Sequence, residues 1–250
     1  MKIATILPTP YLGLEEGNDY HLCLAHLVQK DGAYAAFFRS QSEAGRFVMM
    51  DNGVVETGEA LPMPILMDLT ARVKAKEIVL PDEIYNRERT IRACSRAISE
   101  FLTFQRAYGA KVDLAAVPQG ADAREWINCV RTMVDWPVKT IGISRFVAKY
   151  FPSRKVALES VPELIESKKD IHILGCPGDP IEMCEIEEAF PGRVRGVDSG
   201  IAAMYTQEEM QMEDGDPKPQ VELDFGADNF CLDLLEQNVE WWRKRCKGEV

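Results

Sequence analysis

Residues 171–198 read IHILGCPGDPIEMCEIEEAFPGRVRGVD and contain one strand–helix–strand unit. The apolar runs Ile171–Cys176 and Val194–Asp198 predict strands. Between them, Pro180–Ala189 opens with a proline, which is typical of the first turn of a helix. Two strands joined by a crossover helix run parallel in one sheet. This stretch therefore predicts an α/β fold.

The same alternation recurs along most of the chain, and from the second strand onward the strands begin about 30 residues apart, the length of one βα unit. Seven apolar runs predict strands: Lys2–Pro8, Phe47–Asp51, Glu77–Asp82, Val112–Gln119, Lys139–Ser144, Ile171–Cys176 and Val194–Asp198. An eighth strand is less clear, and Val221–Phe225 is its best candidate. Helical patterns occupy Thr90–Tyr108, Asp122–Val134, Pro162–Ser167, Pro180–Ala189 and Asp228–Cys246.

Repeated βα units build either a closed barrel or an open, doubly wound sheet. The glycine-rich nucleotide loops typical of open sheets are absent: no G-x-G-x-x-G follows the first strand, and no G-x-x-x-x-G-K-[ST] occurs. We therefore expect a (β/α)8 TIM barrel that forms a single domain over residues 1–250. The acidic segment Thr206–Gln220 interrupts the alternation and is either a solvated loop or a lid beside the site.

The charge balance limits the possible partners. Forty acidic and 29 basic residues give a net charge of −11, so a contact with nucleic acid needs a local basic patch. The seven cysteines are scattered without a Cys-x-x-Cys pair, which argues against a zinc site and for reduced thiols in the cytoplasm. No apolar stretch is long enough to span a membrane. The sequence predicts no metal and no cofactor.

Polar side chains end several predicted strands, at the face where barrel enzymes carry their active sites. Asp51, Asp82 and Asp198 each end a strand, and Gln119 ends another. We expect the three carboxylates and the carboxamide to meet at one mouth. Taken alone, each aspartate is equally well explained as the N-cap of the following helix.

Histidine chemistry is not expected at this mouth. His21 and His26 fall in the first predicted helical stretch, and His172 stands at the start of a strand, which is the opposite face of the barrel. The sequence therefore argues against a histidine-based triad, and His172 is expected to be a packed or rim residue.

This set of residue types suits glycosidic chemistry on a nucleoside. A carboxylate beside an amide side chain pairs with the donor and acceptor edge of a purine-like base. A separate carboxylate can attack an anomeric carbon or stabilise an oxocarbenium-like centre. Both tasks are needed to exchange or remove a base.

Five motifs carry a resemblance to a known family. They are FVMMDNG at 47–53, IVLPDE at 78–83, AAVPQG at 115–120, KTIGIS at 139–144, and ILGCPGDPIEM at 173–183 followed by GVDSG at 196–200. In type and order they resemble the strand ends of the tRNA-guanine transglycosylase superfamily, over about three-fifths of the chain. Members of that family are (β/α)8 barrels that exchange a guanine for a 7-deazaguanine in a nucleic acid.

The resemblance implies a role for each residue that matches. Asp198 would be the nucleophile on C1′ and would form a covalent glycosyl-enzyme intermediate. Asp51 would contact the base and move the proton as guanine leaves and the new base enters. Asp82 would accept hydrogen bonds from N1–H and the amino group of the base. The base-binding set implied is Asp82, Gln119, Gly142 and Ser144.

The chain departs from the family's tRNA-acting members in several ways. Their Cys-x-Cys-x-x-Cys…His zinc module after the nucleophile is replaced here by the acidic segment. Asn52 stands where a serine is usual, Ile143 replaces a glycine, and a strongly basic docking surface is missing. In these respects the chain resembles the reduced, often phage-encoded relatives that insert 7-deazaguanine bases into DNA. DNA is therefore the expected partner and a 7-deazaguanine base the expected co-substrate.

A local basic cluster follows the Gly142 strand end and comprises Arg145, Lys149, Arg154 and Lys155. It is either a phosphate-binding surface near the mouth or a solvated helix face. Two other functions stay open: an enzyme acting on a small modified nucleoside, such as a nucleosidase, and a barrel that binds a base without catalysis. The oligomeric state is not predicted.

Overall fold

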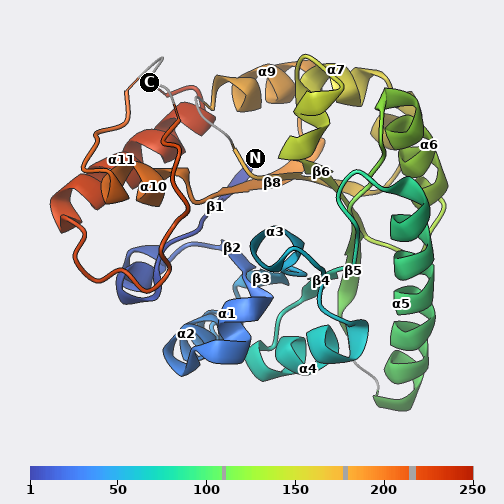
Figure 1. Ribbon diagram of the computed structural model, residues 1–250, viewed down its shortest axis with the longest axis horizontal. Helices are drawn as coiled ribbons and strands as arrows, with labels where there is room; N and C mark the ends of the chain where they lie inside the picture. The colour runs from blue at the N-terminus through green and yellow to red at the C-terminus, as the bar shows by residue number, and fades with distance from the viewer. Residues whose placement is uncertain (109–110, 177–179, 214–217, 250) are drawn as a thin grey trace.

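The computed structural model describes the whole chain except residues 109–110, 177–179, 214–217 and 250. Eight parallel strands form one sheet in the order β1-β8-β7-β6-β5-β4-β3-β2. The sheet curls until β1 lies beside β2, with helices outside it, which makes the predicted (β/α)8 barrel (Figure 1). The strands are β1 (Lys2–Thr5), β2 (Tyr20–Cys23), β3 (Phe47–Met50), β4 (Glu77–Val79), β5 (Asp113–Ala116), β6 (Thr140–Ser144), β7 (Asp170–Leu174) and β8 (Val194–Ser199).

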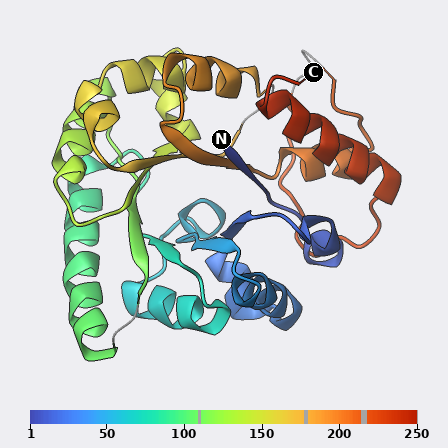
Figure 2. The same ribbon diagram turned by 180° about the vertical axis from the view of Figure 1, so that it is seen from behind.

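Most α-helices of the described residues surround these strands in both views (Figures 1 and 2). The α-helices are α1 (Ala25–Lys30), α2 (Gly32–Glu43), α3 (Val54–Thr57), α4 (Met63–Val73), α5 (Arg87–Tyr108), α6 (Ala123–Val134), α7 (Arg154–Glu159), α8 (Pro162–Glu166), α9 (Ile181–Ala189), α10 (Ile201–Gln207) and α11 (Leu232–Cys246). The short helix α3 is drawn within the ring of strands in Figure 1. Two 3-10 helices are η1 (Thr9–Glu15) and η2 (Arg145–Lys149). The five helices predicted with stated bounds are confirmed, with ends that shift by at most four residues.

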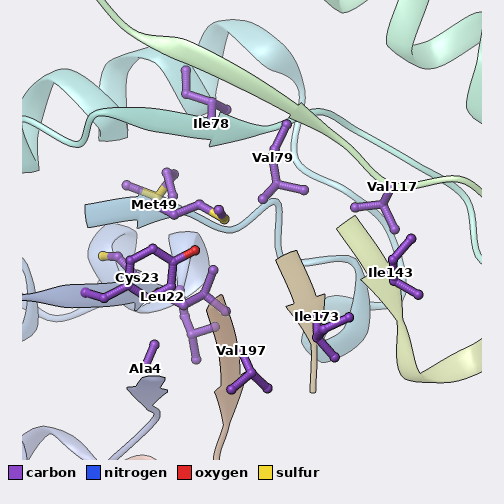
Figure 3. Packing of buried hydrophobic residues seen from close by; sticks show 14 of the residues in the cluster. Ala4, Leu22, Cys23, Met49, Ile78, Val79, Val117, Ile143, Ile173 and Val197 are labelled. Carbon is purple, nitrogen blue, oxygen red and sulfur yellow. The ribbon is translucent and has the colours of Figure 1, made fainter. Parts of the chain in front are cut away.

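Buried apolar side chains from all eight strands form the core. Figure 3 shows part of it, including Val117 directly after β5. Met49 and Ile173, for example, are almost fully buried. Burying a side chain of this size contributes about 2 kcal/mol. The continuous apolar runs of the sequence therefore form strands that are covered on both faces, as parallel sheets require.

The eighth strand is not where the sequence placed it. Residues Val221–Phe225 form no strand, and β2 closes the barrel instead by pairing in parallel with β3 from Tyr20 to Cys23. All four β2 residues are buried. A run of four residues that includes a histidine carries too little apolar pattern to be distinguished from the helix predicted there.

A charged cluster fills the amino-terminal end of the barrel, which we call the floor. Glu77, the first residue of β4, is completely buried, and its Oε2 lies 2.5 Å from Nη2 of Arg195 on β8. Thr140, the first residue of β6, donates its hydroxyl to Oε1 of Glu77 at 2.5 Å. Arg195 also lies over the ring of Phe47, 4.7 Å from its centroid. These contacts tie four strands together at the end of the barrel opposite the mouth.

The acidic segment Thr206–Gln220 is irregular where it is described, except that Thr206 and Gln207 complete α10. Residues 214–217 of it lie outside the described residues. Within the part of the chain that the structure describes, no helix is long and apolar enough to cross a membrane. No group of three or more His, Cys, Asp or Glu side chains in the same part is arranged to hold a metal ion.

Candidate active site

A cavity of about 500 Å³ opens at the carboxyl ends of the strands. Residues from every part of the barrel line it, because the carboxyl ends of parallel strands meet at one face. Six of the predicted site residues lie in its wall: Asp51, Asp82, Gln119, Ser144, Arg145 and Asp198. The structure therefore brings together side chains that are up to 147 positions apart in the chain (51 and 198).

Asp82 forms the centre of a buried polar group. Its Oδ1 accepts from Nδ2 of Asn52 at 2.6 Å, and its Oδ2 accepts from Nε2 of Gln119 at 2.7 Å. Burial of this carboxyl raises its pKa to about 7, against the lowering effect of the two hydrogen bonds. Asn52 thus replaces the expected serine with a side chain that orients Asp82.

Gln119 is oriented in turn by the backbone. Its Oε1 accepts from the N–H of Tyr85 at 3.3 Å, so the amide is fixed from both ends. Tyr85 has a φ of +65°, a left-handed conformation that costs a residue with a large side chain about 1–2 kcal/mol. Strain of this kind persists where the surrounding structure imposes it, often at functional sites. Here the strained conformation of Tyr85 places its N–H against the side-chain amide of Gln119, a predicted base-binding residue.

Asp51 lies at the end of β3, where the chain turns through Gly53. Its Oδ2 accepts from the N–H of Gly53 at 2.8 Å, and Gly53 has a φ of +80°, which only glycine adopts without strain. Burial in the pocket wall, followed by the charge of Asp198, raises the pKa of Asp51 to about 6. Asp51 can therefore both hold and release a proton near neutral pH.

Asp198 is 4% exposed and has a hydrogen-bond partner on each oxygen. Its Oδ1 lies 2.9 Å from Nε2 of His172, and its Oδ2 accepts from the N–H of Gly175 at 3.3 Å. These contacts fix the orientation of the carboxyl group. The prediction that His172 lies on the opposite face is wrong, because its side chain extends within the barrel from the middle of β7 and reaches Asp198.

The pocket includes residues that sequence reasoning missed. His26, on α1, lines it, although no histidine was expected there. Glu56, on α3, adds a further carboxyl, and partial desolvation in the cavity wall together with the charges of Asp51 and Asp198 raises its pKa to about 7. Lys218 and the segment 221–225 line the cavity from the far end of the chain. The position of Glu56, five residues after Asp51 in the connection that follows β3, is the signal that could have identified it.

The structure separates the members of the predicted phosphate-binding cluster. Arg145 lines the cavity, and exposed Lys149 lies nearby with its Nζ 4.0 Å from the centroid of the Tyr85 ring. Arg154 is 2% exposed, paired with Glu182, and donates to the carbonyl of Gly175. Its assignment as a phosphate ligand is therefore wrong, because the guanidinium is already bound within the protein. Lys155, on α7, is half-buried and is not among the described residues that line the cavity.

Gly142 is not among the described residues that line the cavity. A Cβ at this position would stand 2.8 Å from Cδ1 of Leu174, which does line the cavity. The glycine therefore lets Leu174 pack over β6, and this packing explains why a larger residue is excluded. The structure therefore places Leu174 beside Gly142, a member of the predicted base-binding set.

No protein-family model matches the chain, and no curated protein matches it. Among solved structures, D-allulose 3-epimerase from Methylomonas sp. is similar with a TM-score of 0.55 and 9% identity over 98% of both chains. Phosphoribosyl anthranilate isomerase gives 0.51 and 13% over 99% of both chains. The 3-keto-D-glucoside 4-epimerase of E. coli gives 0.51 and 14% over 98% of this chain and 99% of that chain. At such identities the likeness shows the (β/α)8 fold alone.

Proposed function

We propose that this protein is a pentosyltransferase that replaces guanine in DNA with a 7-deazaguanine derivative through a covalent intermediate on Asp198. One observation carries the proposal: a single pocket holds acidic side chains in different environments. Asp198 has a hydrogen-bond partner on each oxygen, whereas the pKa values of Asp51 and Asp82 are raised to about 6 and about 7. Environments that separate acids in this way divide the work of nucleophile and proton carrier.

The reaction divides into two half-reactions that need no further reactant. In the first, an oxygen of Asp198 attacks C1′, the C1′–N9 bond breaks, and its electron pair leaves with guanine, which takes a proton from Asp51. In the second, Asp51 takes the N9 proton of the incoming 7-deazaguanine. N9 then attacks C1′, and the bond from C1′ to Asp198 breaks to restore the carboxylate. Asp82 and Gln119 hold both bases in turn, so one pocket serves both half-reactions.

A nucleic-acid substrate is supported by the positive charge beside the cavity. Arg145 and Lys218 line it, and Lys149 lies exposed over the ring of Tyr85. These three basic side chains provide a local attraction for phosphate, although the net charge of −11 repels phosphate overall. A base within a duplex must be extruded to reach the pocket. We place the enzyme in the cytoplasm, with its DNA substrate.

The overall negative charge favours a second candidate, a nucleosidase or transferase acting on a small modified nucleoside. The cavity of about 500 Å³ is large enough for such a ligand. Both candidates use the same pocket and differ in what surrounds the reacting sugar. Activity on DNA or on a free nucleoside distinguishes the two candidates.

Incorporation of radiolabelled guanine tests the proposal directly. The protein is incubated with labelled guanine and duplex DNA, single-stranded DNA, tRNA or free deoxyguanosine. We expect label to enter DNA, and a 7-deazaguanine to replace it irreversibly. Exchange on deoxyguanosine alone would support the second candidate, and no exchange on any of the four would contradict base exchange.

Arg145→Gln should reveal whether phosphate binds beside the pocket. Removing this charge is expected to weaken DNA exchange about tenfold at moderate salt, while a base or nucleoside binds as before. Lys155→Gln is the matched control, because this lysine does not line the cavity and its charge loss is the same. Equal effects of the two variants on DNA exchange would rule out a specific phosphate contact at Arg145.

Binding of the base is expected to depend on pH through Asp82. Only its ionised form accepts two hydrogen bonds from a guanine-type base, and burial raises its pKa to about 7. Affinity for 7-deazaguanine should therefore fall about tenfold for each pH unit below 7 and level off above it. Calorimetric titration from pH 5.5 to 8.5 measures this, and Asp82→Asn should bind weakly at every pH. A flat profile in the unmodified protein would show that Asp82 does not meet the base.

A further inference from the structure

A column of buried polar side chains runs from the floor of the barrel to Asp198. Nε of Arg195 lies 3.2 Å from the hydroxyl of Tyr20, and that hydroxyl lies 2.8 Å from Nδ1 of His172. Nε2 of His172 then lies 2.9 Å from Oδ1 of Asp198. Tyr20 and His172 are each 1% exposed. We call these four residues the polar column.

The chemistry of the first member fixes the direction of every bond in the polar column. A guanidinium can only donate, so the hydroxyl of Tyr20 accepts from Arg195. The hydroxyl proton then goes to Nδ1 of His172, the remaining partner of that oxygen among the described contacts. An imidazole that accepts at Nδ1 carries its proton on Nε2 and donates it to Asp198. The column therefore delivers an N–H donor to one oxygen of that carboxylate.

The floor holds the first member of the column in place. Arg195 is paired with the buried Glu77 and donates to Oγ1 of Thr140 at 2.9 Å. A second acid, Asp170, lies 3.4 Å from its Nη1. Gly196, on the strand that carries Asp198, leaves room for the Tyr20 ring, because a Cβ there would stand 2.6 Å from Cε1 of that ring. Arg195 and Gly196 therefore determine the position of the Tyr20 side chain.

We infer that His172 and Tyr20 are positioning residues for the nucleophile, and that the polar column holds Asp198 as an oriented carboxylate. This inference rests on the proposed function. The N–H of Gly175 and Nε2 of His172 occupy one lone pair on each carboxylate oxygen, which fixes the plane of the group below the cavity. Nε2 of His172 also faces Asp198 in the second half-reaction, when the bond from C1′ to Asp198 breaks and the carboxylate forms again. Both half-reactions therefore use the column, although its first three members touch neither base nor sugar.

The tautomer of His172 provides a test that does not need activity. The chain has three histidines, so a two-bond ¹H–¹⁵N spectrum of histidine-labelled protein at pH 7.5 is simple to assign with His172→Gln. We expect the proton of His172 on Nε2 and none on Nδ1. We expect Tyr20→Phe to abolish this single-tautomer signature. A proton on Nδ1 in the unmodified protein, or an unchanged signature in Tyr20→Phe, would overturn the column.

Kinetics test the consequence for the reaction. Tyr20→Phe and His172→Phe should lower the exchange rate about ten- to hundredfold, with affinity for 7-deazaguanine within about twofold, since neither residue meets the base. His172→Gln should recover most of the rate, because its amide keeps an N–H donor near the Nε2 position. Tyr34→Phe is the matched control, since Tyr34 is equally buried and its hydroxyl accepts only from the N–H of Leu24 among the described contacts.

The two tests separate the positioning role from the proposed function. If Tyr20→Phe and Tyr34→Phe lose the same rate, or if His172→Gln is no better than His172→Phe, the positioning role is wrong. If the unmodified protein exchanges no base on any substrate, the proposed function fails. In that case the tautomer of His172 still decides whether the column exists.

Discussion

Asp198→Asn is expected to abolish base exchange, with a loss of at least about 10⁴-fold. An amide is too weak a nucleophile to attack C1′, and the change removes the charge that stabilises an oxocarbenium-like centre. The amide oxygen can still accept from His172, so the barrel should stay folded. The measurements are labelled-guanine incorporation and a denaturing gel of quenched reactions, in which the unmodified protein gives a covalent protein–DNA band and the variant gives none.

Asp113→Asn is the control for this variant. Asp113 is exposed at the start of β5, at the opposite end of the barrel from the cavity. It should exchange guanine at the unmodified rate and melt at the same temperature. Full activity in Asp198→Asn, or a covalent band in that variant, would remove Asp198 from the role of nucleophile.

Glu77→Leu is expected to cause the largest loss of stability, about 3–5 kcal/mol. The change leaves Arg195 charged and without its main partner at the floor, where Glu77 is fully buried. For a chain of this length, the melting temperature should fall by about 10 °C. Denaturation in urea measures the free energy of unfolding.

A double variant separates loss of the ion pair from loss of packing. Glu77→Leu combined with Arg195→Met should recover much of the stability, because no charge is then left buried alone. The exposed pair of Arg96 and Glu100 on α5 provides the reference, and Glu100→Gln should change stability by less than about 0.5 kcal/mol. If Glu77→Leu costs no more than this reference, the floor does not hold the strands together.

The position of the four polar residues at strand ends could be predicted, because the barrel fold brings the ends of its strands to one face. Asp51, Asp82, Gln119 and Asp198 each follow an apolar run, and parallel strands bring such positions to one face whatever their separation in the chain. The sequence pattern therefore predicted both the barrel and these four polar residues of its pocket. It gave no information on the hydrogen bonds among the side chains, or on the burial that raises the pKa values of Asp51 and Asp82.

Other parts of the site depend on contacts that no local pattern records. His172 was misplaced because the start of a strand does not reveal which side chain lies inside the barrel or how far it reaches. Arg154 looked like a free cation because its partner, Glu182, comes from a different helix. Lys218 and the segment 221–225 belong to irregular chain, which has no periodicity from which a position could be predicted.

The pairing of β1 with β8 has a consequence for biosynthesis. Ala4 is in register with Asp198, and Thr5 with Ser199. The pairing of β1 therefore cannot form until β8, the last strand of the barrel, has been synthesised. Contacts between such distant parts of a chain form slowly, since their entropy cost comes before their stabilisation. The nucleophile therefore reaches its working position in the final step of closure. A nascent chain that has most of its barrel already holds the base-binding groups, yet it has no means of attacking a nucleotide.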